Sequence, residues 1–159
     1  MANHEGVEQV LGLEGRDFNI RKAEFVKELL GVKNVEFKLQ NLEQPNLIEF
    51  GHFDAVYCTG LFYHLSKPWT LLEQIYQVSN YLFIDTHYAT KEEVAVDKYM
   101  GIFYQEYGYN DALSGLEEQS FWPSFKHLAL MILDSGFKIS KFIDVPNVNG
   151  SRAWLLCEK

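Results

Sequence analysis

The sequence predicts an α/β fold in which a mainly parallel β-sheet carries helices on both faces. Short apolar runs alternate along the chain with amphipathic helical stretches, a pattern typical of parallel sheets. The last two apolar runs are joined by a short polar turn, which predicts an antiparallel hairpin at one edge of the sheet. With 159 residues, 47% of them hydrophobic, the chain can bury one core, so we expect a single domain over residues 1–159.

The first half of the chain reads as strand, helix, strand, strand. Residues 9–13 (QVLGL) form a short apolar strand, and Asp17 is placed to cap a helix that ends near Gly31. Residues 34–39 alternate apolar and polar side chains, and residues 53–58 form an apolar run between two glycines. Both runs predict strands.

The second half adds a helix and a strand, a long interval, and then a helix and two strands. Pro68 and Pro123 are each placed to open a helix, because proline lacks an N–H that the first turn does not need. The expected elements are helix 69–79, strand 80–85, helix 124–135, strand 138–145 and strand 152–159, with the turn PNVNGS between the last two.

The interval from Tyr88 to Trp122 departs from this alternation. It is about as long as two ordinary elements, and aromatic residues are crowded inside it. We expect this insert, residues 88–122, to form a lid.

Composition excludes several classes of function. The formal charge of -8 comes without a run of Lys or Arg, so nucleic acid is not an expected partner. No apolar run has the roughly 20 residues of a membrane helix, and the first residues lack the pattern of a signal peptide, so we expect a cytoplasmic protein that does not enter a membrane. Cys58 and Cys157 lie in apolar runs without metal-ligand spacing, which predicts reduced core thiols and no metal site.

Six stretches follow one another along the chain from Val10 to the C-terminus: LEGR, LQNL, FDAVYCTGLFYHL, GLFYHLSKPWTLLEQI, SFWPS and DSGF. In these residues and in their order the chain resembles a class I S-adenosylmethionine-dependent methyltransferase from its second strand onward. The resemblance implies a Rossmann-like sheet, S-adenosylmethionine as cofactor, and transfer of its methyl group to a small or medium acceptor molecule.

The same resemblance implies a first strand and a glycine-rich turn that this sequence lacks. The chain contains no G-x-G, and a glycine roughly 20 residues before Glu14 falls ahead of Met1. We therefore expect an N-terminally truncated sheet. The missing strand lies between the second and fourth strands in the family, so its loss exposes two strand edges.

Three arrangements can cover those edges. The second and fourth strands can close up against each other, a separate polypeptide can supply the missing strand, or identical chains can pair. We favour a homodimer formed by strand exchange or edge pairing, because identical chains reach it at low cost.

The resemblance implies a set of residues that bind the cofactor. Glu14, with Gly15 beside it, is expected to accept hydrogen bonds from the ribose hydroxyls, although it can equally pair with Arg16. The other expected cofactor residues are Asn41 and Leu42 at the adenine, and Thr59, Gly60 and Leu61 on the far side. Strand ends that simply turn into loops are the alternative for these positions.

Tyr63, His64 and His87 are the candidates for acid-base chemistry. They follow the fourth and fifth strands of the family order, at the carboxyl end where open α/β sheets bind ligands, and imidazole titrates near neutral pH. Packing and capping are the alternative role for His64. Tyr104 and Trp122 are expected to wall the acceptor site, or else to form a protein interface.

Two other functions remain compatible with the sequence. A catalytically inactive homodimeric binding or structural module could keep a methyltransferase fold, and the missing glycine turn favours it. A Rossmann-like oxidoreductase is a weaker alternative, since it too needs the glycine motif.

Overall fold

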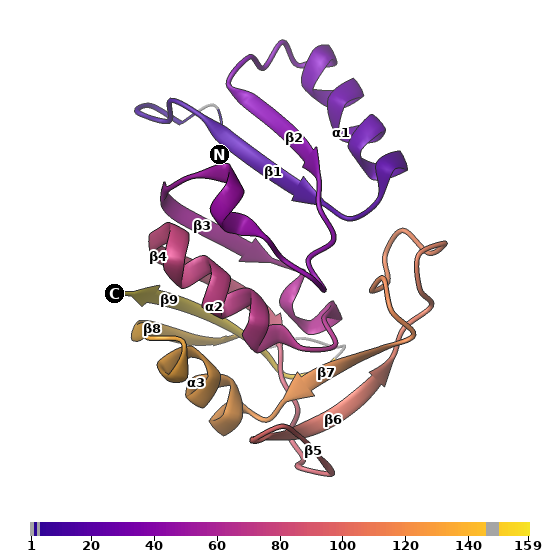
Figure 1. The fold of residues 1–159 in the computed structure, drawn as a ribbon, viewed down its shortest axis with the longest axis vertical. Coiled ribbons are helices and arrows are strands. Elements are labelled where there is room, and N and C mark those ends of the chain that lie inside the picture. Colours follow the sequence, from indigo (N-terminus) through magenta and orange to yellow (C-terminus); the bar gives the residue numbers. More distant parts are fainter. Residues whose placement is uncertain (1, 3, 146–149) are drawn as a thin grey trace. The chain divides into compact units, whose positions relative to one another are not determined.

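The computed structural model describes residues 2, 4–145 and 150–159 and has an α/β architecture, as predicted (Figure 1). The chain divides into two compact units, Met1–Leu42 and Glu43–Lys159.

The smaller unit is a β-α-β motif. Strands β1 (Val10–Glu14) and β2 (Val35–Leu39) pair in parallel, and α1 (Asp17–Leu29) connects them. One expectation is wrong: Asp17 is the first residue of α1, and Arg16, in extended backbone, holds the cap position, where its side chain does not cap the helix. Asp17 still favours the helix, because a carboxylate in the first turn complements the helix dipole.

In the described part of the larger unit, four strands form one sheet in the order β3-β4-β9-β8. The strands are β3 (Phe53–Thr59), β4 (Ser79–His87), β8 (Lys138–Val145) and β9 (Arg152–Glu158). β3 and β4 are parallel, whereas β9 runs antiparallel to both of its neighbours. The antiparallel edge is confirmed. Residues 146–149 of the predicted turn lie outside the described residues.

Helices α2 (Pro68–Val78) and α3 (Phe125–Asp134) contact each other on one face of this sheet (Figure 1). Short 3-10 turns, η1 (Leu47–Phe50) and η2 (Phe62–His64), precede α2. The core between helices and sheet is aliphatic; its fully buried side chains include Leu72, Ile75, Leu82, Ile84, Leu128 and Leu155. Cys58 and Cys157 are buried free thiols, and burial raises the pKa of each to about 12.

The insert is mostly sheet, and its expected role as a lid remains a prediction. β5 (Val94–Val96), β6 (Tyr99–Gln105) and β7 (Gln119–Pro123) form an antiparallel sheet. Pro123 ends β7 opposite Gly101 instead of opening α3, and Ser124 caps that helix. Of the aromatic residues crowded in the insert, Tyr99, Phe103 and Tyr104 lie in β6, whereas Tyr107 and Tyr109 follow this strand. A loop, residues 106–118, joins these two strands.

The face of the larger sheet opposite α2 and α3 is apolar and exposed. Alternation along β4 places Leu82 and Ile84 in the core and Tyr81 and Phe83 on the other face. Exposed side chains on this face include Tyr57, Tyr81, Trp154 and Leu156, between 41% and 57% exposed. β3 forms one edge of this sheet.

No helix within the described ranges is both long enough and apolar enough to cross a membrane.

Candidate active site

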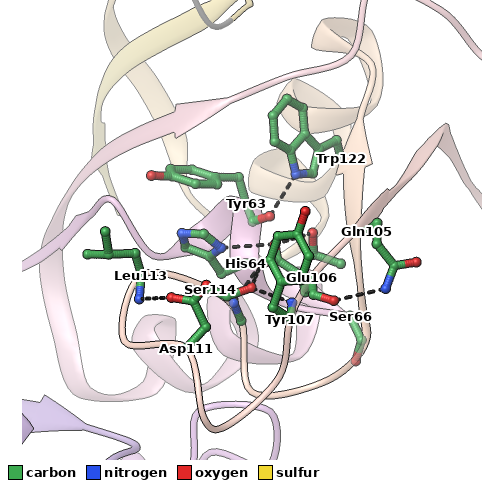
Figure 2. A network of polar contacts seen from close by, with 12 residues as sticks. Tyr63, His64, Ser66, Gln105, Glu106, Tyr107, Asp111, Leu113, Ser114 and Trp122 are labelled. Atoms are coloured by element: carbon green, nitrogen blue, oxygen red, sulfur yellow. Dashed lines mark hydrogen bonds and ion pairs between the residues drawn. The ribbon is translucent and has the colours of Figure 1, made fainter.

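The segment that follows β3 carries Tyr63 and His64, and neighbouring elements hold its backbone. Phe62 is fully buried beneath it. The indole N–H of Trp122, on β7, donates to the Tyr63 carbonyl at 2.8 Å (Figure 2). Because both contacts fix the η2 turn, the positions of Tyr63 and His64 depend on the β6-β7 sheet as well as on β3.

Five of the residues singled out in the sequence form one ring cluster in the larger unit. The ring of Tyr63 lies 4.3 Å from that of His64, 4.8 Å from that of His87 and 5.9 Å from that of Trp122, measured between centroids. Trp122 stacks on His87 at 5.0 Å and on Tyr104 at 4.4 Å. The fold thus brings together residues from four separate stretches of the chain.

His64 is bound by a buried carboxylate that the sequence did not indicate. Its Nδ1 lies 2.9 Å from Oε1 of Glu106, at the end of β6, and the two side chains are 20% and 2% exposed (Figure 2). Among the described residues, Nε2 of His64 has no hydrogen-bond partner. A carboxylate on one imidazole nitrogen with the other nitrogen open is the arrangement of a general base.

Several donors keep Glu106 ionised. Burial by itself raises the pKa of this carboxyl, but hydrogen bonds from His64, the Gly115 amide, Ser114 and Ser120 outweigh it and lower the pKa to about 2. Glu106 is therefore an anion at neutral pH and can only accept hydrogen bonds.

His87 differs from His64 because both of its ring nitrogens have partners. Nδ1 lies 3.2 Å from the Ser151 carbonyl, and Nε2 lies 3.4 Å from Nη1 of Arg152. Burial lowers its pKa, so the ring is neutral at neutral pH. This geometry suits a packing role beside Trp122 better than proton transfer.

A second ion pair in the cluster, between Asp85 and Arg152, was also missed. Nε and Nη2 of Arg152 donate to the two carboxylate oxygens of Asp85 at 2.6 and 2.7 Å. The guanidinium lies 5.8 Å from the Tyr63 ring centre. Burial raises the pKa of the Tyr63 phenol, which remains protonated at neutral pH. An acidic residue at the end of an apolar run was the one signal for Asp85 in the sequence.

The expected cofactor residues Thr59, Gly60 and Leu61 lie at the carboxyl end of β3, beside this cluster. Gly60 has a φ of 67°, and its amide donates to the Asp85 carbonyl at 3.1 Å. A Cβ at Gly60 would meet nothing closer than the Tyr63 hydroxyl, 3.9 Å away. The backbone here is open to a ligand, which fits a cofactor that approaches the main chain closely.

The remaining cofactor candidates, Glu14, Gly15, Asn41 and Leu42, lie in the smaller unit. Glu14 ends β1, and its Oε1 accepts the Arg16 amide at 2.9 Å. The contact with Arg16 thus exists, but through its backbone. One carboxylate oxygen closes the turn and the second has no hydrogen-bond partner among the described residues, which fits a ribose hydroxyl. Asn41 and Leu42 follow the end of β2.

No cluster of three or more His, Cys, Asp or Glu side chains with the geometry of a metal site occurs in the described part of the chain.

The fold is that of an S-adenosylmethionine-dependent methyltransferase domain. The model of the methyltransferase domain family matches residues 1–80, half of the chain, and the chain belongs to this family.

Solved structures agree with this assignment. The N-terminal domain of EvdMO1, crystallised in the presence of SAH and D-fucose, is 29% identical with a TM-score of 0.85, over 99% of this chain and 68% of that domain. A second structure, of EvdMO1, is 26% identical with a TM-score of 0.72, over 99% of this chain and 33% of that one. A methyltransferase from Clostridium acetobutylicum shares the fold, with 11% identity and a TM-score of 0.66, over 94% of this chain and 74% of that one. No curated protein matches the sequence.

Proposed function

We propose that this chain is a methyltransferase domain that transfers the methyl group of S-adenosylmethionine to a hydroxyl group of a small sugar. The observation that carries the proposal is the pair of His64 and Glu106, in which a buried anion binds Nδ1 and Nε2 stays open. A sugar hydroxyl loses its proton far above neutral pH, so O-methylation benefits from a positioned base.

Two further observations support a sugar as acceptor. The N-terminal domain of EvdMO1, 29% identical to this chain, was crystallised in the presence of SAH and D-fucose. The ring cluster combines the aromatic faces of Tyr63 and Tyr104 with the polar pair of Asp85 and Arg152. Sugars present both apolar C–H faces and hydroxyl groups, and such a surface suits both.

Each part of the chain has a distinct task in this proposal. Glu14 would bind the cofactor ribose, and the backbone of Thr59, Gly60 and Leu61 would line the cofactor. S-adenosylmethionine supplies a methyl group on a positively charged sulfur. Nε2 of His64 accepts the hydroxyl proton as the acceptor oxygen becomes methylated, and Tyr63 and Tyr104 hold the acceptor in line.

Cofactor binding is tested by calorimetric titration with S-adenosylmethionine and S-adenosylhomocysteine. We expect micromolar binding that Glu14→Ala weakens roughly tenfold or more, since ribose hydrogen bonds to a charged group contribute about 1.5–3 kcal/mol. Glu28→Ala, the same change on an exposed position of α1, is the control. Absence of binding at millimolar cofactor would contradict the proposal.

Methyl transfer is tested by incubating the protein with cofactor and a panel of 6-deoxy and ordinary hexoses, and detecting O-methyl products by mass spectrometry. We expect His64→Gln to lower the rate by about 100-fold or more, the usual contribution of a general base. His52→Gln, an exposed histidine in the same unit, should leave the rate unchanged. If His64→Gln retains the full rate, His64 is not the base.

A catalytically inactive homodimeric module is the second candidate function. The position of β3 at the edge of its sheet and the exposed aromatic face of that sheet favour this alternative, because edge strands and exposed apolar faces promote association. Light scattering of the purified chain decides it together with the titration: a stable dimer that binds no cofactor would support the module over the enzyme.

A further inference from the structure

Glu106 contacts two parts of the larger unit at once. Its Oε1 lies 2.9 Å from Nδ1 of His64 and accepts a hydrogen bond from the Ser120 hydroxyl at 2.8 Å. Its Oε2 accepts hydrogen bonds from the Ser114 hydroxyl and the Gly115 amide, both at 2.6 Å. The carboxylate therefore ties the η2 turn to the loop 106–118, as Figure 2 shows.

We propose that Glu106 is a positioning residue that holds His64 in the tautomer with its proton on Nδ1, so that Nε2 is the proton acceptor. This inference rests on the proposed function. A neutral imidazole carries one N–H, and an ionised carboxylate cannot donate, so Nδ1 must be the protonated nitrogen. Nε2 then presents a lone pair on a side chain that is 20% exposed.

The two sides of Glu106 make glutamine an informative substitution. Glutamine has the same shape but one accepting oxygen and one donating NH₂ group. The Gly115 backbone N–H can only donate, so the amide oxygen is expected on the side of Gly115 and Ser114. The NH₂ group then faces His64, and Nδ1 must present a lone pair, which moves the histidine proton to Nε2.

The tautomer is measured directly by long-range ¹⁵N–¹H correlation spectra of the labelled full chain at about pH 8, where histidine is ordinarily neutral. The signals of His64 are assigned by their loss in His64→Gln. In the wild-type protein we expect roughly a tenfold or larger excess of the form protonated on Nδ1, given a charged hydrogen bond. In Glu106→Gln we expect the form protonated on Nε2.

Glu118→Gln is the matched control, because the Glu118 side chain is exposed in the same loop, and its spectrum should equal that of the wild type. A wild-type His64 protonated on Nε2 would overturn the inference, and this measurement does not depend on whether the variant folds. A folded Glu106→Gln that keeps the proton on Nδ1 would overturn it as well.

The tautomer is measured without turnover, so a failure of this inference can be distinguished from a failure of the proposed function. If the protein transfers no methyl group but shows the expected tautomers, the proposed function fails and the positioning role of Glu106 stands. If transfer occurs, Glu106→Gln should lower kcat by about 100-fold and change KM little, because the affected group acts on the proton and not on binding.

Discussion

Gly115 shows how closely the loop 106–118 approaches the segment that carries His64. A Cβ at this position would lie 2.6 Å from the His64 carbonyl oxygen and 3.1 Å from Cγ of Glu106. Real side chains do not tolerate the first distance, so the backbone of the loop or of the η2 turn has to move. The glycine is needed here for space and not for an unusual backbone conformation.

Gly115→Ala is therefore expected to lower the free energy of unfolding by about 1–3 kcal/mol, the usual cost of overpacking. It should also displace the Gly115 amide from Glu106. Urea denaturation followed by circular dichroism measures the first effect. Leu113→Ala, a change in the same loop at a side chain that is 87% exposed, should have little effect; equal stability of the two variants would show that the loop moves away without cost.

Trp122 contributes a hydrogen bond as well as a ring. Its indole N–H donates to the Tyr63 carbonyl at 2.8 Å. Trp122→Phe keeps an aromatic ring and removes the donor, and we expect a loss of about 1–2 kcal/mol in the free energy of unfolding. Trp154→Phe, on the exposed sheet face, is the matched control and should cost less than about 0.5 kcal/mol. Equal losses of stability in the two variants would show that the indole hydrogen bond is not the cause.

At the scale of elements, α3 begins where β7 ends, and Ser124 makes the transition. Its Oγ accepts the His127 amide at 3.4 Å and donates to Glu92 Oε1 at 2.6 Å. The preceding proline is a strand residue because its carbonyl accepts the Ala89 amide at 2.8 Å and it pairs with Gly101. The local pattern, a proline followed by a helical stretch, predicted that Pro123 opens the helix, whereas strand pairing places this residue at the end of β7.

Ser124→Ala is expected to lower the free energy of unfolding by about 1 kcal/mol, the usual cost of losing a helix cap. Ser140→Ala, at an exposed serine of β8 whose hydroxyl donates to the Leu156 carbonyl and caps no helix, serves as the control. Thermal melts of both variants provide the comparison, and an unchanged melting temperature in Ser124→Ala would mean that the cap does not stabilise α3.

At the scale of the whole molecule, acid is expected to destabilise the fold in two steps. The pKa of His87 is lowered from 6.5 by burial, so below that pH the unfolded chain binds the proton more readily than the folded one. The pKa of Glu106 is lowered from 4.5 to about 2, so its contribution is complete above pH 4.5 and disappears as the pH falls to about 2.

Protonation of Glu106 should lower the free energy of unfolding by roughly 3 kcal/mol, because a change of one unit in pKa corresponds to about 1.36 kcal/mol. Urea denaturation at pH 6, 4 and 3 should therefore show a loss of stability in the wild type that is smaller in Glu106→Gln. Glu118→Gln should follow the wild type. Parallel curves for the wild type and Glu106→Gln would contradict an ionised Glu106 in the folded protein.

Outside the insert, the sequence by itself determined the order of the elements and the edge hairpin, because apolar periodicity is a local property of the chain. It also selected Tyr63, His64, His87, Tyr104 and Trp122, which the fold brings into one cluster. The tertiary structure alone decided that the insert is a sheet and that Glu106 faces His64 across 42 positions of the chain. Such partners arise from strand pairing between distant segments, which no local pattern records.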